Sequence, residues 1–358
     1  MTAGTMVSSG KQVDDVVGTL EGVSASRGLD ALTARLVALR GLLASDLAEV
    51  EVALAQVGLD ADTPAHLSAR HLLALGGKRL RPICVALASH VGVGFTPAAR
   101  TYAIAVEMVH SATLLHDDVV DLGDRRRGAD AARVVYGNAA SIFGGDWLLA
   151  DALCRVHAAG VDGVLERMLQ VVKEMVSAEA LQLAARGRVR ASASEYFRIV
   201  QGKTASLFRW AMFAGGRAGG VGPRECEVLE SYGGLLGLAF QIVDDVLDFA
   251  GEPDDTGKDL LADLREGKMT YPLILAVERD PGLGAALEAH CAEEDAPIGT
   301  DLARRIGRVM AEGGVVEDCL ALAARLCKDA ARSLDVLPPS TARAALEDVA
   351  MATARRRK

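Results

Sequence analysis

Apolar residues recur at three- and four-residue intervals along most of the chain, which is the period of amphipathic helices. Residues 30–56 place Leu and Val between charged positions in this way, and similar segments follow at residues 98–122, 138–160, 164–187 and 225–250. Several of these segments are apolar on nearly every side, so we expect them to lie inside a layer of other helices. Clusters of Gly, Pro and charged residues separate them.

This pattern predicts an all-α fold with one large helical bundle domain at residues 29–350, although 358 residues would allow about two domains. Residues 1–28 lack a clear period and predict a flexible N-terminal tail. Residues 351–358 predict a basic C-terminal tail, and we expect its last five residues, ARRRK, to be solvated.

Composition narrows the possible partners and the compartment. The net charge of −9 leaves no broad basic excess for a phosphodiester backbone, so nucleic acid is not expected as a partner. The 6 cysteines are scattered without a C-x-x-C pair, which is typical of reduced thiols. The polar N-terminus has no apolar core of a signal peptide, and no apolar run is long enough to span a membrane. We therefore expect a cytoplasmic protein.

Two acidic clusters interrupt apolar helical segments, DDVVD at residues 117–121 and DDVLD at residues 244–248. On a helix, carboxylates four residues apart stand on one face, so each cluster forms a pair of like charges. Such a pair needs a counter-cation, and an all-oxygen set favours Mg²⁺. The alternative is that each cluster is a solvated helix face, but two copies, each preceded by apolar residues, favour the metal site.

Basic motifs accompany the acidic ones: GGKRLRP at residues 76–82, GDRRRG at residues 123–128, QGKT at residues 201–204 and a Lys-containing segment at residues 257–268. Any one of them alone is better explained as a surface charge run. Arg and Lys side chains together are suited to phosphate oxygens. Combined with the carboxylates in a net-acidic chain, they indicate a compact polyanion such as a diphosphate.

Six blocks in this order resemble the all-trans isoprenyl diphosphate synthases, also called the polyprenyl synthetase family. They are GGKRLRP, HSATLLHDDVVDLGDRRRG, GNAASIFGGDWLLADAL, GKTASLF, GLAFQIVDDVLDF and GKDLLADLREGKMTYPL. The motifs are most similar to those of octaprenyl- and decaprenyl-type enzymes. The resemblance implies an isoprenoid synthase fold with a deep central cavity, a homodimer, and two substrates, isopentenyl diphosphate and an allylic diphosphate. Peripheral contact with a membrane stays open.

The resemblance also assigns roles to residues. It implies that magnesium, as three ions with substrate bound, is held by Asp117, Asp121, Asp244 and Asp248. It implies catalytic roles for Asp117, Asp118, Asp121, Asp244, Asp245 and Lys203. The allylic diphosphate is expected at Arg126, Lys203, Thr204, Gln241 and Lys258. Isopentenyl diphosphate is expected at Lys78, Arg81, His110 and Arg127. An isolated His in an apolar helix is more often structural, but His110 lies two turns before Asp117 on one face.

The implied reaction is metal-assisted ionisation of the allylic diphosphate, 1′-4 condensation with isopentenyl diphosphate and loss of a proton. Small residues, Ala112 and Thr113, lie one turn before the first acidic cluster, with Met108 and Val109 a turn further. Chain growth should therefore pass this level and give a medium- or long-chain polyprenyl diphosphate, a precursor of quinone side chains. A floor near Leu149, Cys154 or Met175 stays open.

Three other functions stay open: a short-chain farnesyl or geranylgeranyl diphosphate synthase, a class I terpene cyclase, and a non-catalytic regulatory subunit of a synthase. Asp259, Leu261 and Tyr271 depart from the usual family pattern near the loop that contains Lys258. None of these departures removes a predicted metal ligand.

Overall fold

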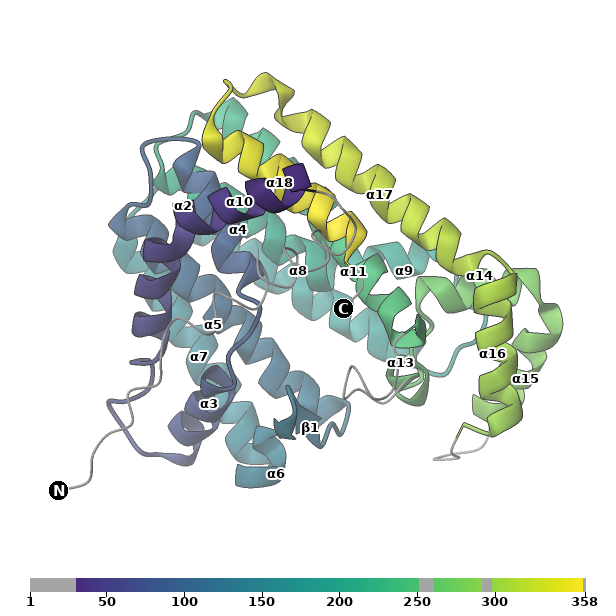
Figure 1. The fold of residues 1–358 in the computed structure, drawn as a ribbon. Coiled ribbons are helices and arrows are strands. Elements are labelled where there is room, and N and C mark those ends of the chain that lie inside the picture. Colours follow the sequence, from purple (N-terminus) through teal and green to yellow (C-terminus); the bar gives the residue numbers. More distant parts are fainter. Residues whose placement is uncertain (1–29, 251–260, 292–297, 357–358) are drawn as a thin grey trace. The chain divides into compact units, whose positions relative to one another are not determined.

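The structure is a computed structural model that describes residues 30–250, 261–291 and 298–356 (Figure 1). In these ranges nearly all regular structure is helical, and the strands are the two-residue β1 (Arg125–Arg126) and β2 (Ala129–Asp130), an antiparallel pair. The predicted all-α class is confirmed. No described helix is both long and apolar enough to cross a membrane.

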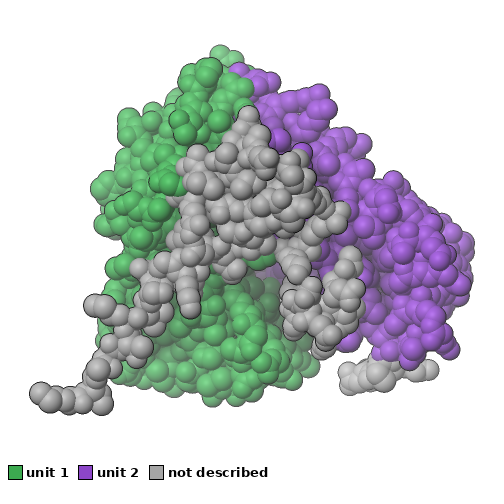
Figure 2. Space-filling view, in the orientation of Figure 1, with its two compact units in different colours: residues 1–168, 210–230, 336–348 green, residues 169–209, 231–335, 349–358 purple. Residues whose placement is uncertain are grey.

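Contacts divide the chain into two compact units, coloured separately in Figure 2. Unit 1 comprises residues 1–168, 210–230 and 336–348, and unit 2 comprises residues 169–209, 231–335 and 349–358. Some helices contain residues of both units: α8 (Val164–Ala185), α10 (Ser206–Ala218), α11 (Pro223–Ala250), η2 (Leu334–Val336) and α18 (Thr341–Arg355). The single domain at residues 29–350 stays a prediction.

The central helix of unit 1 is α5 (Pro97–Val120), and the first acidic cluster lies at its C-terminal end. Pro97 suits the first helical turn, and the Thr96 hydroxyl caps it by accepting a hydrogen bond from the Ala99 N–H at 3.1 Å. Around α5 pack the other helices of the unit: α2 (Asp30–Leu54), α3 (Pro64–Ala74), α4 (Leu80–His90), α6 (Ala132–Tyr136) and α7 (Asn138–Ala159). Because α5 is buried along most of its length, its last turn is held by the core.

Unit 2 contains α9 (Ala193–Val200), η1 (Gln201–Ala205), α13 (Ala262–Arg265), α14 (Tyr271–Arg279), α15 (Pro281–Cys291), α16 (Thr300–Glu312) and α17 (Val315–Ser333). The GKT motif falls in η1, a π-helical turn between α9 and α10. A Cβ at Gly202 would lie 2.6 Å from the Ala178 Cβ, so the close approach of η1 to α8 requires glycine. Irregular turns of this kind often mark functional sites.

The C-terminal boundary predicted from the sequence is wrong. Helix α18 continues to Arg355, and Ala352 and Thr353 are buried, so residues 351–355 are not a solvated tail. The apolar face of the helix includes Ala350 and Ala352, which are buried, so the helix continues although basic residues follow. The predicted N-terminal tail at residues 1–28 lies outside the described residues.

Candidate active site

The first acidic motif, residues 117–121, closes α5 in unit 1. Asp117 and Asp121 are half-buried, whereas Asp118 is 1% exposed. Asp118 Oδ1 accepts hydrogen bonds from Arg126 Nε at 2.9 Å and from Arg126 Nη2 at 2.5 Å. Asp118 Oδ2 is buried and has no hydrogen-bond partner among the described residues. Burial raises the pKa of Asp118 above its usual value, and Arg126 opposes this shift.

The GGKRLRP segment of unit 1 is anchored through Arg79. Arg79 is buried in the left-handed backbone region at φ 50° and precedes α4. Its guanidinium donates to Glu51 and Glu107, each at 2.6 Å. Removing one partner of such a buried network typically costs about 3–5 kcal/mol. Arg79 thereby fixes the backbone between Lys78 and Arg81, which lies in the first turn of α4.

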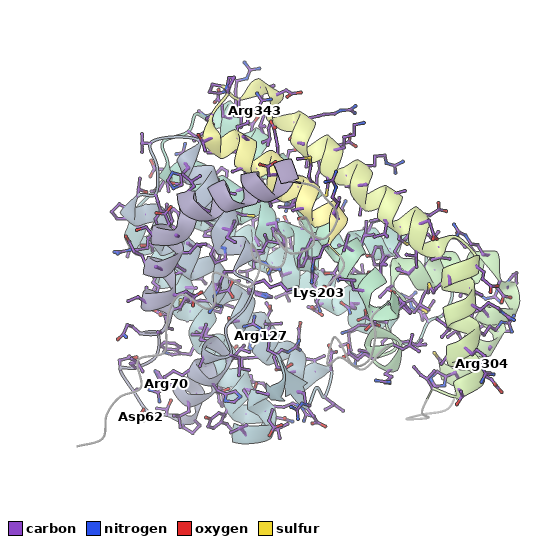
Figure 3. All side chains as sticks on the ribbon, viewed as in Figure 1. Asp62, Arg70, Arg127, Lys203, Arg304 and Arg343 are labelled. Carbon is purple, nitrogen blue, oxygen red and sulfur yellow. The ribbon has the colours of Figure 1, made fainter. Side chains whose placement is uncertain are left out.

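The structure brings most of the residues predicted for isopentenyl diphosphate together in unit 1. Burial and the charges of nearby arginines lower the pKa of His110 well below its usual value, and these arginines are Arg81, Arg127, Arg126 and Arg79. Arg127 also lies against the loop, since a Cβ at Gly77 would be 2.9 Å from its Nη2. Figure 3 labels Arg127 within the side chains of the whole chain. We call His110 and these four arginines the basic cluster.

A neutral His110 predicts a specific pH dependence of stability. Its folded pKa lies below the unfolded value of about 6.5, so the unfolded chain binds more protons and the folded state loses stability as the pH falls through 6.5. We expect wild type to lose about 1–2 kcal/mol relative to H110Q between pH 7 and pH 5. Urea unfolding at both pH values measures this, with H157Q, a change at an exposed His, as control. Parallel pH profiles for wild type and H110Q would contradict the assignment.

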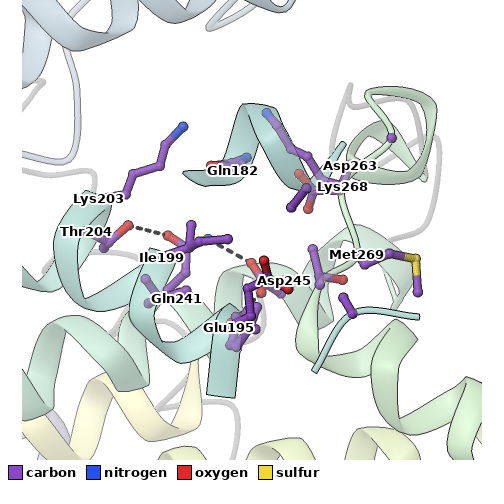
Figure 4. A pocket seen from close by; sticks show the side chains of 16 residues that line it. Gln182, Glu195, Ile199, Lys203, Thr204, Gln241, Asp245, Asp263, Lys268 and Met269 are labelled. Atoms are coloured by element: carbon purple, nitrogen blue, oxygen red, sulfur yellow. Dashed lines mark hydrogen bonds between the residues drawn. The ribbon is translucent and has the colours of Figure 1, made fainter. Parts of the chain in front are cut away.

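The second acidic motif, residues 244–248, lies on α11 in unit 2. Asp245 is 3% exposed and accepts hydrogen bonds from Tyr196 Oη at 2.6 Å and from Gln241 Nε2 at 2.7 Å. Thr204 Oγ1 donates to Gln241 Oε1 at 2.8 Å, so this series of hydrogen bonds extends to η1 (Figure 4). Burial raises the pKa of Asp245 well above its usual value, and the charge of Asp263 adds to this. Gln241 and Thr204 thus connect to Asp245 through side chains.

The outer carboxylates of the same motif, Asp244 and Asp248, make different contacts. Arg356 Nη2 donates to Asp244 Oδ1 at 3.1 Å, and its guanidinium lies 4.9 Å from the centre of the Phe240 ring. Asp248 accepts the backbone N–H groups of Ala262 at 3.3 Å and Asp263 at 3.4 Å, at the start of α13. Asp244 therefore already has a basic counter-charge from the C-terminal end of the chain.

A cavity of about 130 Å³ lies in unit 2 beside this motif, and its lining includes the predicted Lys203, Thr204, Gln241 and Asp245. Lys203 forms an ion pair with Glu179. The lining adds Asp263, whose pKa is raised to about 7, first by burial and then by the charge of Asp248. It also adds Lys268, which forms an ion pair with Glu266. Two predicted positions, Lys258 and Asp259, lie outside the described residues.

The positions predicted to set product length lie within unit 1. Met108, Val109 and Ala112 are buried, and Thr113 is half-buried with its hydroxyl donating to the His110 carbonyl at 2.8 Å. Cys154, an alternative floor position, is exposed. Ala112 is therefore part of the packed core of unit 1, and Thr113 lies at its edge.

Comparison with known proteins decides the family. The sequence model of the Polyprenyl synthetase family matches residues 65–300. The chain belongs to the polyprenyl synthetase family. It is 39% identical over 238 residues to octaprenyl diphosphate synthase of Escherichia coli K12. The aligned region covers 66% of this chain and 73% of that protein. It is 32% identical over 317 residues to heptaprenyl diphosphate synthase component 2 of Geobacillus stearothermophilus, covering 88% of this chain and 98% of that protein.

A solved structure extends the likeness to the fold. Polyprenyl synthase of Caulobacter crescentus CB15, crystallised with calcium and isoprenyl diphosphate, matches with a TM-score of 0.83 and 35% identity. The match covers 89% of this chain and 97% of that one. The isoprenoid synthase fold predicted for this polyprenyl synthetase is thereby confirmed.

Two departures of this polyprenyl synthetase from the usual pattern have a structural place. Leu261 takes the left-handed backbone conformation at φ 65° and precedes α13, a position where an L-residue carries strain. Tyr271 stacks on Tyr196, with ring centres 5.7 Å apart and an angle of 26° between the rings. Both residues lie near the chain of hydrogen bonds that holds Asp245.

Some site residues of the polyprenyl synthetase were missed by sequence reasoning. Tyr196 lies between Glu195 and Phe197, and this local sequence does not distinguish it from a core aromatic. For Asp263 the sequence did offer a signal, because a single carboxylate within the apolar segment LLADL indicates a candidate site residue. Arg356 was assigned to a solvated tail, because its partner Asp244 is 112 positions away.

Proposed function

We propose that this chain is a trans-prenyltransferase that condenses isopentenyl diphosphate with an allylic diphosphate to form an all-trans polyprenyl diphosphate. The grouping of Arg81, His110 and Arg127 in unit 1 is the observation that carries the proposal, because it offers basic groups for a second diphosphate in addition to Arg126, which bonds to Asp118. A terpene cyclase ionises one prenyl diphosphate and has no need of a second such site. Two intact acidic motifs also argue against a regulatory subunit.

The proposed roles follow the family motifs. Isopentenyl diphosphate would bind at Lys78, Arg81, His110 and Arg127, and the allylic diphosphate at Arg126, Lys203, Thr204, Gln241 and Lys258. The arginine forks suit diphosphate oxygens, and a neutral His110 can donate one N–H to them. Gln241 donates to Asp245 and accepts from Thr204, which supports an additional role for both residues in holding the Asp245 carboxylate.

The acidic motifs fit a divalent cation. Among the described residues no three His, Cys, Asp or Glu side chains are grouped as a ready metal site. Mg²⁺ commonly uses one or two carboxylates and completes its shell with water and substrate phosphates. The buried Oδ2 of Asp118, which has no hydrogen-bond partner among the described residues, supports a cation beside the first motif. We propose Asp117, Asp121, Asp244 and Asp248 as ligands of three Mg²⁺ ions, which neutralise the diphosphate leaving group when bound.

The chain's own residues support the remaining chemistry. As the allylic C–O bond breaks, its electrons go to the diphosphate, where Lys and Arg side chains stabilise the charge. The double bond of isopentenyl diphosphate then forms a bond to the allylic carbocation, and one proton is lost, for which the released diphosphate is the proposed base. The apolar interior around α5 excludes water, which would otherwise quench the cation.

We propose a medium- or long-chain product, of the kind attached to respiratory quinones. The small, interior positions Ala112 and Thr113 support it, as do the octaprenyl and heptaprenyl activities named for the relatives. We also propose that the reaction takes place in the cytoplasm, which the free state of all six cysteines supports.

The reaction type is tested by omission. Purified protein with labelled isopentenyl diphosphate, farnesyl diphosphate and Mg²⁺ should form a labelled prenyl alcohol after dephosphorylation. Omitting either substrate, or adding a chelator, should abolish it. Cyclic hydrocarbon from farnesyl diphosphate alone would indicate the cyclase instead. No product with any allylic primer would indicate a regulatory subunit.

We further propose a homodimer, supported by an apolar stripe on α8. Leu169, Val176 and Leu183 are exposed at seven-residue spacing, which places them on one helix face. Val176 is 65% exposed, so V176E should not disturb the fold but should place a charge in the contact and convert dimer to monomer. Analytical ultracentrifugation measures this, with V336E, at a 69% exposed position of η2, as control. An unchanged dimer in V176E would contradict this surface.

A further inference from the structure

The carboxylate of Asp245 is held from two sides inside unit 2. Tyr196 Oη donates to Oδ2 at 2.6 Å, and Gln241 Nε2 donates to Oδ1 at 2.7 Å. Asp245 and Tyr196 are both buried. Losing one donor would leave a buried carboxylate oxygen without its partner, which is far more costly than losing an exposed hydrogen bond. The Tyr196 hydroxyl is therefore not an incidental contact.

The ring of Tyr196 is itself fixed by aromatic neighbours. It stacks on Tyr271 at 5.7 Å and meets Phe197 edge-on at 5.2 Å, and Phe197 also contacts Tyr271 at 5.2 Å. Val200 and Ile274 complete the cluster. The three rings come from α9 and α14, while Asp245 comes from α11, so the hydrogen bond ties these helices together. A ring held by these contacts presents its hydroxyl at one point.

Fixing Asp245 also fixes the direction of its neighbours on α11. Successive residues of an α-helix are rotated by about 100°, so Asp245 points to a different side from Asp244. Asp244 and Asp248, four residues apart, share a face. A carboxylate anchored at Asp245 therefore sets the rotation of this turn, and with it the direction in which the outer pair points.

We propose that Tyr196 is a positioning residue of the second acidic motif: its hydroxyl anchors Asp245 and thereby orients Asp244 and Asp248 toward the divalent cation that accompanies the allylic diphosphate. Tyr271 supports the same function by holding the Tyr196 ring. The substrate part of this inference rests on the proposed function, whereas the cation part can be tested without any substrate.

The test removes only the hydroxyl. Y196F keeps the packed ring, and we expect it to bind Mn²⁺ about tenfold more weakly than wild type when free Mn²⁺ is measured by electron paramagnetic resonance without substrate. In the condensation assay we expect a higher KM for the allylic diphosphate and a lower kcat, with the KM for isopentenyl diphosphate unchanged. Y271L, which keeps the hydroxyl but loses the stacked ring, should show a smaller effect in the same direction.

The control is Y136F, the same chemical change on α6 of unit 1, which should leave Mn²⁺ binding and both KM values as in wild type. Wild-type Mn²⁺ binding in both Y196F and Y271L would overturn the inference. An equal rise in both KM values would also overturn it, because general damage to the fold would act on both substrates. Weaker Mn²⁺ binding in Y196F, with no product formed by wild type, would support the positioning function while contradicting the proposed reaction.

Discussion

Asp117→Asn and Asp244→Asn should each lower kcat/KM for condensation by at least about a thousandfold, an effect comparable to losing a main electrostatic stabiliser of a transition state. Asn keeps the size of the side chain but removes the charge that holds a divalent cation against the leaving diphosphate. Both residues are half-buried, so the amide should not unfold the chain. Steady-state kinetics with saturating Mg²⁺ measures the loss.

Asp301→Asn is the matched control, because Asp301 is exposed at the start of α16 and pairs only with Arg304 in its own helix among the described contacts. It should retain wild-type kinetics. Activity within tenfold of wild type in either D117N or D244N would show that the motif concerned does not hold the cation.

Thr113→Phe should shorten the main product from a medium or long chain to C20 or less. The phenyl ring would stand one turn before Asp117 and block the path that we propose for the growing product, whereas the native Thr is small and half-buried. V109F, a further turn from the motif, should give a main product longer than that of T113F. Chromatography of the dephosphorylated products measures both.

Val52→Phe, at an exposed position of α2, should leave the product length unchanged. Product lengths that increase from T113F to V109F to wild type would support growth of the product along α5. The same product lengths in T113F, V109F and wild type would show that residues of another helix stop chain growth.

Sequence periodicity predicted the long helices. The predicted segments 98–122, 138–160 and 164–187 correspond to α5, α7 and α8 within about two residues at each end. Pro97 and Thr96 explain the start of α5, because both are local signals. The C-terminal boundary failed because burial of Ala352 and Thr353 depends on distant partners, which no local pattern reports.

The candidate site could be predicted only in part from the sequence. Spacing indicated that Asp117 pairs with Asp121, and Asp244 with Asp248. It did not separate these from Asp118 and Asp245, which the structure buries and bonds to Arg126 and Tyr196. A repeat of four residues defines a helix face, but which carboxylate points inward depends on the neighbouring helices.

Long-range pairs explain what was missed. Arg356 meets Asp244 across 112 positions, and Tyr196 meets Asp245 across 49. The residues next to these positions in the sequence do not indicate either contact. The Glu51–Arg79–Glu107 network is similar, since its three members lie on different segments of unit 1. The resemblance to a family supplied the roles of residues, and the structure supplied the contacts that hold them.

The most direct test of the central claim is the length of the product. Purified wild-type protein would receive labelled isopentenyl diphosphate, farnesyl diphosphate and Mg²⁺, and the dephosphorylated products would be sized by chromatography. We predict metal-dependent chains well beyond C20. Chains that end at C15 or C20 would contradict the account of a medium- or long-chain polyprenyl diphosphate synthase.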